Sequence, residues 1–206
     1  HAAGVRAGDI CHNSFSYHLT PGGWLLDTAA RALGAAVFPA GVGNTDLQVE
    51  ALAHFRATVF CGTPDFLKIL LERAREMNAD VSSLTKAVVG GGALPPSLRQ
   101  LVRDEFGVTP IQNYGTADLG LIAYESPAME GMLLNEGAVV EIVRPGSGDP
   151  VPEGEVGEVV VTILNHDYPL TRFATGDLSA ILPGQSPCGR TAPRIKGWMG
   201  RADQTT

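Results

Sequence analysis

The chain has 206 residues, of which 44 % are apolar and 18 % are charged, so it is long enough to bury a hydrophobic core and ordinary for a globular protein. Its formal charge of −7 argues against a bulk electrostatic grip on nucleic acid or an acidic membrane, although a locally positive pocket could still bind a small anion. Three well-separated cysteines make a disulfide framework unlikely and indicate a reducing compartment. The sequence has no long apolar run and no signal peptide, and we predict the cytoplasm.

The first part of the chain alternates short apolar runs with helical patterns. We expect strands over residues 10–15, 35–38, 57–61, 86–89 and 109–114. We expect helices over 22–33, from Thr45, from Pro64 and over 95–106. This alternation predicts an α/β fold, in which right-handed crossovers build a mostly parallel sheet with helices on both faces.

Capping residues and apolar faces sharpen the helix assignments. Thr45 and Gln48 have capping-box spacing, Thr63-Pro64 supplies an N-cap followed by proline, and Gly107 is a stop signal. The four helices are expected to turn the following residues inward: Trp24, Leu25, Ala29, Ala32 and Leu33; then Leu47, Ala51, Leu52 and Phe55; then Phe66, Leu67, Leu70, Leu71, Ala74 and Met77; then Leu98, Leu101, Val102 and Phe106.

Glycines follow successive predicted strands: Gly41 and Gly43, then Gly62, then residues 90–92, then Gly115. In an open α/β sheet these positions fall at the carboxyl ends of the strands, where ligands bind. Each glycine alone is ordinary turn chemistry, but the succession favours a ligand site for phosphate or carboxylate.

The pattern changes after about residue 118. Strands are expected over 119–124, 139–143, 156–163, 170–173 and 178–182, without helices between them and with turns at 145–150 and 152–154. We therefore predict an α/β subdomain over residues 1–118 and, over residues 119–206, a small antiparallel sheet or distorted barrel.

Three ordered segments carry a resemblance to a known family: Asn113–Asp118, Thr171–Leu178 and Gly200–Asp203. Supporting stretches are 17–23, 62–64 and 91–95. Together they resemble the adenylate-forming superfamily of acyl-CoA synthetases, adenylation domains and luciferases, and its phenylacetate–CoA ligase branch most of all. The resemblance covers essentially the whole chain and implies that the α/β part belongs to an AMP-binding domain.

The resemblance implies roles for individual residues. Tyr114 would stack on the purine, Asp177 would accept hydrogen bonds from the ribose hydroxyls, and Arg201 would lie near ribose and phosphate. It assigns catalysis to Asp118 and Arg172, with Asp118 also facing Mg²⁺. The remaining assignments are nucleotide contacts by Gly91, Gly92, Ala93, Asn113, Gly115 and Thr116, an acyl-substrate border at Tyr17, His18, Gly22 and Gly23, and a hinge at Asp203 before a C-terminal domain. Trp24 is expected in the helix core, and Trp198 has no assigned role.

The implied reaction uses ATP, Mg²⁺ and coenzyme A to activate an aryl or arylacetic acid as an acyl-AMP and pass it to the CoA thiol. Nucleic acid and membrane partners are not expected, and a homodimer is an analogy with relatives. The family usually has serine or threonine where this chain has Ala117, glutamate where it has Asp118, and arginine where it has Ala174. The cysteine metal ligands that some relatives carry near positions 124–135 are absent.

No stretch matches the family's phosphate loop, so we expect a piece of a larger N-terminal domain, inactive alone. Two alternatives remain open. One is a related adenylating enzyme whose acceptor is a carrier-protein thiol or another cofactor. The other is a module that binds a nucleotide or acyl group without catalysis.

Overall fold

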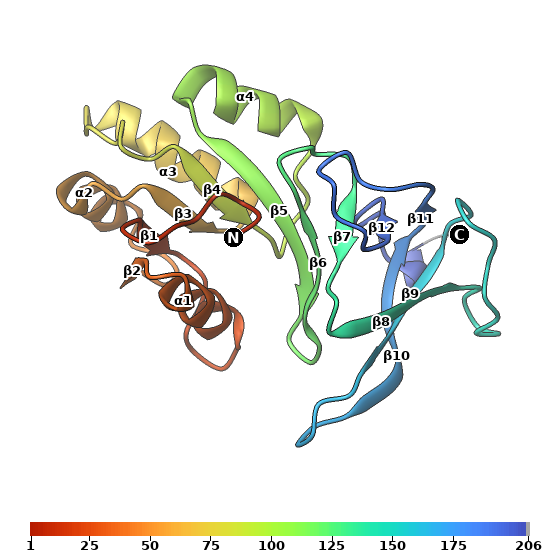
Figure 1. Cartoon of the computed structure of the whole chain (residues 1–206). Coiled ribbons are helices and arrows are strands. Elements are labelled where there is room, and N and C mark those ends of the chain that lie inside the picture. Colours follow the sequence, from red (N-terminus) through yellow and green to blue (C-terminus); the bar gives the residue numbers. More distant parts are fainter. Residues whose placement is uncertain (205–206) are drawn as a thin grey trace. The chain divides into compact units, whose positions relative to one another are not determined.

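The computed structural model describes residues 1–204, which form two compact units by their contacts: residues 1–112 and the described residues from Asn113 onward. The chain passes from one to the other within strand β5 (Thr109–Thr116). Each unit is shown with its elements labelled in Figure 1. The boundary of the predicted subdomains, at 118, lies six residues after the last residue of the first unit, Gln112.

The first unit is the predicted parallel α/β structure. Its strands are β1 (Ile10–Asn13), β2 (Ala36–Pro39), β3 (Val59–Gly62), β4 (Lys86–Val89) and the first half of β5, in the order β2-β1-β3-β4-β5, and all pairs are parallel. The helices are α1 (Gly22–Ala32), α2 (Thr45–Phe55), α3 (Pro64–Glu76) and α4 (Pro96–Phe106).

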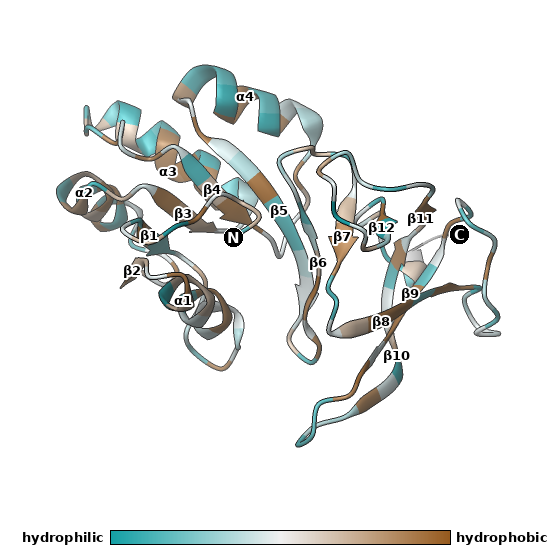
Figure 2. Cartoon of the chain, in the orientation of Figure 1, coloured by the Kyte–Doolittle hydropathy of each residue, from teal (hydrophilic) through white to brown (hydrophobic). Residues whose placement is uncertain are grey.

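Two hydrophobic cores lie on the two faces of this sheet, as strand β3 shows. Phe60 packs with residues of α2, α3 and α4, whereas Val59 and Cys61 pack with Ala30 of α1. Alternation along the strand sends successive side chains to opposite faces, so one strand serves both cores. Figure 2 shows brown hydrophobic residues along β3 and mixed colours on α3 and α4, as expected for helices that bury one side.

Local signals at α3 and α4 work as predicted. Thr63 accepts a hydrogen bond from the Phe66 amide at 3.4 Å, and Pro64 begins the helix. Gly107 ends α4 with a left-handed conformation, φ +68°. The expected inward residues of both helices are buried or packed against the core.

The expected faces of α1 and α2 are wrong for most of their residues, although Leu52 is buried in one core and Leu33 packs against the other. Trp24 is 60 % exposed and is not a core residue, and α1 instead buries Gly23, Asp27 and Ala30. In α2, Leu47 and Phe55 are 63 % and 45 % exposed, and the buried residues are Gln48, Val49 and Leu52. The capping box is also absent, because the N-cap is Asn44 and makes no side-chain cap, while the Gln48 amide donates to the carbonyls of Gly41 and Gly43.

The second unit is antiparallel. The second half of β5 pairs with β6 (Gly120–Glu125), followed in order by β7 (Met132–Leu134), β12 (Arg194–Ile195) and β11 (Ile181–Leu182). A separate three-stranded sheet has the order β10-β9-β8, with β8 at Ala138–Val143, β9 at Gly157–Ile163 and β10 at Leu170–Ser179. A short 3₁₀ helix, η1, covers Ala202–Gln204.

Two strands, β7 and β12, were not predicted, and the two strands expected over 170–173 and 178–182 are mainly one long strand, β10, followed by β11. Gly115 lies inside β5 rather than after it. No helix among residues 1–204 is long and apolar enough to cross a membrane.

Candidate functional site

A bulge in β10 carries the centre of the candidate site. Ala174 pairs with Val160 and Leu178 with Glu158, so Thr175, Gly176 and Asp177 lie opposite Val159 alone. A bulge of this kind interrupts the alternation of side chains and re-aims them. Gly176 adopts φ +73°, and a Cβ atom there would lie 2.6 Å from the Arg201 guanidinium, so this bulge residue combines a left-handed backbone with close approach of a cation.

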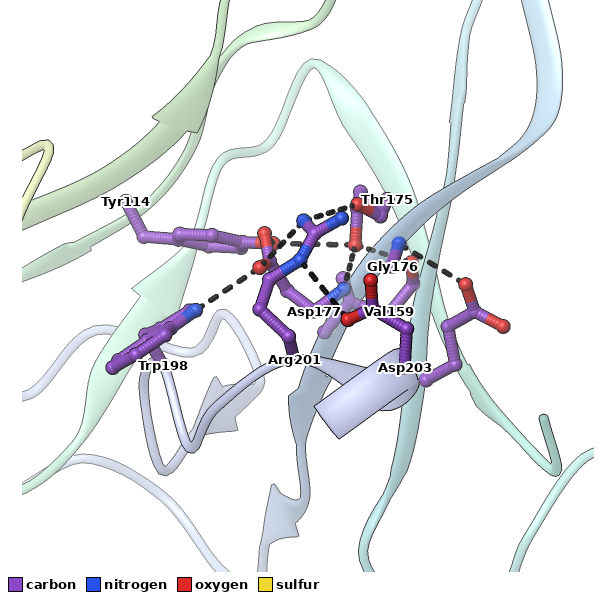
Figure 3. Close-up of polar contacts among 9 residues, drawn as sticks. Tyr114, Val159, Thr175, Gly176, Asp177, Trp198, Arg201 and Asp203 are labelled. Atoms are coloured by element: carbon purple, nitrogen blue, oxygen red, sulfur yellow. Dashed lines mark hydrogen bonds and ion pairs between the residues drawn. The ribbon is translucent and has the colours of Figure 1, made fainter. Parts of the chain in front are cut away.

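Asp177 is the most connected side chain of the cluster (Figure 3). Its Oδ2 accepts a hydrogen bond from the Tyr114 hydroxyl at 2.9 Å. Its Oδ1 accepts from the Trp198 indole at 3.0 Å and from Arg201 at 3.1 Å. Asp177 is only 8 % exposed, so these donors replace much of the water that a carboxylate requires.

Thr175 ties the cluster to the neighbouring strand. Its hydroxyl donates to the Val159 carbonyl at 2.8 Å and accepts from the Asp177 amide at 3.1 Å. Its carbonyl accepts from Arg201 at 3.0 Å. The bulge is therefore held by side-chain hydrogen bonds where the strand ladder is interrupted.

Tyr114 is a hydrogen-bond donor at every physiological pH. Burial raises the pKa of its phenol well above the ordinary value, and the adjacent Asp177 carboxylate adds to the increase. The ring belongs to the core of the second unit and is 8 % exposed. The contact that the geometry provides is thus from its hydroxyl to Asp177.

Arg201 and Asp203 follow on a neighbouring segment. Arg201 forms an isolated bridge with Asp177 through the backbone, and its guanidinium lies 3.8 Å from the Asp203 carboxylate. The Asp203 side chain is 75 % exposed. Of the predicted nucleotide residues in this unit, the structure therefore brings Tyr114, Asp177 and Arg201 together, with Asp203 beside them.

The remaining predicted residues of β5 and its turn have structural contacts of their own. Asn113 pairs with Tyr124 of β6. A Cβ at Gly115 would lie 2.3 Å from the Gly120 carbonyl, so glycine is required there for strand packing. The Thr116 hydroxyl accepts from the Leu119 amide at 3.2 Å, which closes the turn that presents Asp118 to solvent.

The contacts of Arg172 are with other residues than the Asp177 cluster. Its backbone has φ +48°, and its side chain binds Glu141 at 3.1 Å and the Gly148 carbonyl at 2.8 Å. Within residues 1–204, no three or more His, Cys, Asp or Glu side chains are grouped to hold a metal ion. An Asp118-bound Mg²⁺ would fit only if phosphate and water supplied its other ligands, which is the usual arrangement for this ion.

In the first unit, Tyr17 has a carboxylate partner as well. Its hydroxyl donates to Asp27 at 3.0 Å and accepts from Asn13 at 2.8 Å. Burial, and then the Asp27 carboxylate, raise the pKa of Tyr17 to about 12. Arg31 closes the cluster by binding the other oxygen of Asp27.

Glycine lets Tyr17 approach α1. A Cβ at Gly23 would lie 2.7 Å from the Ser16 carbonyl and 2.9 Å from the Tyr17 ring. At Gly22 the nearest atom would be 3.6 Å away, which is ordinary contact. Of the four residues predicted to border the acyl substrate, Tyr17 and Gly23 are thus in direct contact with each other, whereas His18 is exposed.

One of the glycine segments that were predicted to lie at the carboxyl ends of the parallel strands follows β4 and is exposed. Gly91 (φ +68°), Gly92 and Ala93 are all exposed, and Gly91 lies near Phe15 and Thr63. The segment thus offers backbone at the carboxyl ends of the parallel strands, the position at which open α/β sheets bind ligands.

Sequence reasoning missed several residues of the two clusters. Trp198 precedes the Gly200-Arg201 motif by two residues, and that proximity was the only available signal. Asp27 and Arg31 have the spacing of a helical ion pair, but nothing in the sequence connects them with Tyr17. Asn13 carried no signal, because its partners depend on the tertiary fold.

Comparison with solved structures identifies the fold. The chain superposes with a TM-score of 0.91 and 27 % identity on 2-hydroxyisobutyryl-CoA ligase in complex with 2-HIB-AMP and CoA, covering 98 % of this chain and 47 % of that one. It also resembles the fold of the anthranilate CoA ligase AuaEII in complex with anthranoyl-AMP, with a TM-score of 0.72 and 21 % identity over 98 % of this chain and 41 % of that one. The fold is that of adenylate-forming ligases.

The sequence agrees with the fold. Residues 14–163 match the AMP-binding enzyme family, and the chain belongs to that family. It is 34 % identical to a phenylacetate-coenzyme A ligase of Thermus thermophilus over 98 % of this chain and 47 % of the relative. It is 30 % identical to the Escherichia coli enzyme of the same name over 95 % of this chain and 47 % of the relative. The chain thus spans about half the length of the curated relatives that it matches.

Proposed function

We propose that this chain supplies the adenosine-binding part of an ATP-dependent acid–CoA ligase that activates an aryl or arylacetic acid. The observation that carries the proposal is the buried Asp177 carboxylate, which Tyr114 and Arg201 bind in a chain of the AMP-binding enzyme family. The names of the phenylacetate-coenzyme A ligases and the AMP- and CoA-bound ligase structures support this class of substrate and acceptor.

The proposed reaction has two balanced steps. A carboxylate oxygen of the acid attacks the α-phosphorus of ATP, and pyrophosphate leaves with its bonding electron pair. The CoA thiol, after losing its proton, then attacks the acyl carbon, and AMP leaves. Both steps depend mainly on positioning and on stabilisation of phosphate charge, to which Mg²⁺ held near Asp118 would contribute.

Within this scheme Asp177 accepts hydrogen bonds from the vicinal ribose hydroxyls, and Arg201 faces the ribose and phosphate. The Tyr114 hydroxyl holds one carboxylate oxygen at 2.9 Å, which limits rotation of the Asp177 side chain. Residues 91–93 would offer backbone to the adenine, Tyr17, His18, Gly22 and Gly23 would border the acid, and Asp203 would be the hinge. Arg172, whose side chain binds Glu141 and Gly148 in this structure, would have to leave these partners to take its predicted catalytic role.

Nucleotide binding by the chain tests the proposal directly. At ten times its Kd, AMP should raise the melting temperature by about 3–5 °C, because a ligand that binds only the native state stabilises it by mass action. Asp177→Ala should abolish the shift. Asp27→Ala removes the comparable carboxylate of the first unit and should retain it. Absence of a shift for the wild-type chain at millimolar AMP, or an unchanged shift for Asp177→Ala, would contradict the proposal.

Acid-dependent ATP–pyrophosphate exchange by the full-length protein tests the substrate class. We expect exchange with phenylacetate or a related aryl acid and little with short aliphatic acids. Exchange with aliphatic acids alone would contradict the aryl assignment and leave the nucleotide assignment intact.

A further inference from the structure

Trp198 sits on a segment that is fixed to the end of β10. The Ser179 hydroxyl donates to the Gly197 carbonyl at 2.8 Å, the Met199 amide donates to the Leu178 carbonyl at 2.9 Å, and the Leu178 amide donates to the Gly200 carbonyl at 2.9 Å. Gly197 and Gly200 have φ of +98° and +120°, which other residues rarely adopt. The backbone on both sides of Trp198 is therefore set independently of any ligand.

This segment directs the indole N–H to Oδ1 of Asp177 at 3.0 Å, although the Trp198 residue remains 47 % exposed (Figure 3). An indole nitrogen can only donate, so the contact occupies an acceptor position of Oδ1 and favours one orientation of the carboxylate. Packing alone does not account for the position of Trp198, because about half of the residue is in contact with solvent. The hydrogen bond to Asp177 accounts for the orientation of its indole.

The two oxygens of Asp177 are not equally occupied. Oδ1 accepts from both Trp198 and Arg201, whereas among residues 1–204 Oδ2 accepts from Tyr114 alone. Because a carboxylate oxygen has about two acceptor positions, Oδ1 is full and Oδ2 has one position left. Two vicinal ribose hydroxyls that bridge both oxygens therefore require one donor to leave Oδ1.

Arg201 is the donor that is able to leave. Its side chain is 43 % exposed and long, and it has other partners in the Thr175 carbonyl at 3.0 Å and Asp203 at 3.8 Å. Trp198 has two side-chain torsions and a backbone fixed at both neighbouring residues, so it stays in place.

We propose that Trp198 is a positioning residue for ribose recognition: its indole N–H holds Oδ1 of Asp177 in place while Arg201 gives up that oxygen to a ribose hydroxyl. The inference rests on the proposed adenosine site and adds to it a residue and an exchange of partners. Trp198 acts through Asp177 and is not required to touch the nucleotide.

The test compares AMP with an analogue that lacks both ribose hydroxyls, dideoxy-AMP, by calorimetric titration of the protein. Trp198→Phe keeps an aromatic ring and removes the N–H. Its AMP affinity should fall about tenfold or more, the effect expected for loss of one hydrogen bond to a charged group, while its dideoxy-AMP affinity stays within about twofold of wild type. Trp24→Phe, at the other half-exposed tryptophan, should change neither affinity.

The outcomes separate the two proposals. Wild-type protein that binds both nucleotides equally, or neither, would overturn the ribose role of Asp177 and with it the inference. Wild-type discrimination combined with unchanged AMP affinity in Trp198→Phe, or with equal losses for both nucleotides, would overturn the role of Trp198 alone.

A fluorescence measurement covers the case in which Trp198→Phe fails to fold. In Trp24→Phe, Trp198 is the only tryptophan. AMP should change its emission because the partners of Oδ1 change, and dideoxy-AMP should leave the emission near its starting value. Identical spectra with and without saturating AMP would contradict the exchange at Oδ1.

Discussion

The two units of this chain contain the same chemical cluster in two forms. In the first unit, Asp27 binds the Tyr17 hydroxyl with one oxygen and Arg31 with the other. In the second unit, Asp177 binds the Tyr114 hydroxyl with one oxygen and Arg201 with the other. Both aspartates are buried, at 7 % and 8 % exposure, so these donors replace hydrogen bonds that water would otherwise supply.

The clusters differ in how far apart their members lie in the sequence. Tyr17, Asp27 and Arg31 lie within one turn and one helix, and Asp27 and Arg31 are four residues apart. Tyr114 and Asp177 are 63 residues apart and meet only when several strands have paired. Local assembly suits a cluster that fixes a loop on a helix, whereas the distant one also receives Trp198 on a glycine-bounded segment. The difference indicates a structural role for Asp27 and a binding role for Asp177.

The largest difference between the two clusters is expected when each aspartate is replaced by asparagine. Asp177→Asn should weaken AMP binding by about 50-fold, because the ribose loses hydrogen bonds to a charged acceptor. Calorimetric titration measures the loss. A change of less than threefold would show that the two carboxylates have equivalent structural roles.

Gly23→Ala should lower the free energy of unfolding by about 1–3 kcal/mol, because its Cβ would overlap the Ser16 carbonyl and the Tyr17 ring. Gly22→Ala is the matched control, since its Cβ meets only ordinary contacts, and its effect should stay below about 0.5 kcal/mol. Urea denaturation compares the two. Equal effects would argue that Tyr17 does not need close packing on α1.

Asp27→Asn should lower the free energy of unfolding by about 1–2 kcal/mol, because the Tyr17 hydroxyl and Arg31 lose a charged acceptor. AMP affinity should remain within twofold of wild type. The same denaturation and titration experiments measure both quantities. A larger loss of AMP affinity than of stability would contradict a purely structural role.

Alkaline pH should destabilise the protein through its buried tyrosines. A tyrosine whose pKa is raised by folding contributes stability that is complete below the unfolded pKa of about 10 and is lost as pH rises toward the folded pKa. For Tyr17 that window runs from about 10 to about 12. Solvent around the half-buried phenol screens its neighbours, so we expect less than about 1 kcal/mol from this residue.

Tyr17→Phe and Tyr114→Phe should each reduce the slope of stability against pH above pH 10, as urea denaturation in this range would measure. Tyr168→Phe, at a residue 57 % exposed, is the control. A slope that neither buried substitution reduces would contradict the contribution of these phenols.

The smallest expected effect is that of Arg31. Its side chain is 57 % exposed, so Arg31→Gln should lower the free energy of unfolding less than Asp27→Asn does, and added salt should reduce the difference from wild type. Urea denaturation in low and high salt measures this difference. A loss that equals that of Asp27→Asn and does not depend on salt would contradict a solvent-screened ion pair.

Prediction from sequence succeeded where signals were local. Thr63-Pro64 and Gly107 define helix ends by hydrogen bonding and φ preference, which need no tertiary partner. The prediction of the buried face failed at α1. Trp24 and Leu25 have the spacing of an inward face, but both are exposed. One tertiary partner of that helix is Tyr17. Its ring needs a glycine on the buried face, and its hydroxyl needs a carboxylate there.

Short and irregular strands were also beyond prediction. Strands β7 and β12 have three and two residues, too few to show a period. The motifs identified Tyr114, Asp177 and Arg201 as members of one site, and their side chains do meet. Trp198 and Thr175 joined them only in the structure, because one depends on two left-handed glycines and the other on a bulge.

The bulge of β10 separates the residues that pair with β9 from the residues that form the Asp177 cluster. Thr175, Gly176 and Asp177 face Val159 alone, and the amides of Gly176 and Asp177 bind the side chains of Glu158 and Thr175 instead of the ladder. A substitution at the paired residues on either side would therefore act first on the pairing of β9 with β10. A substitution at one of these three residues would act first on the contacts with Tyr114, Trp198 and Arg201.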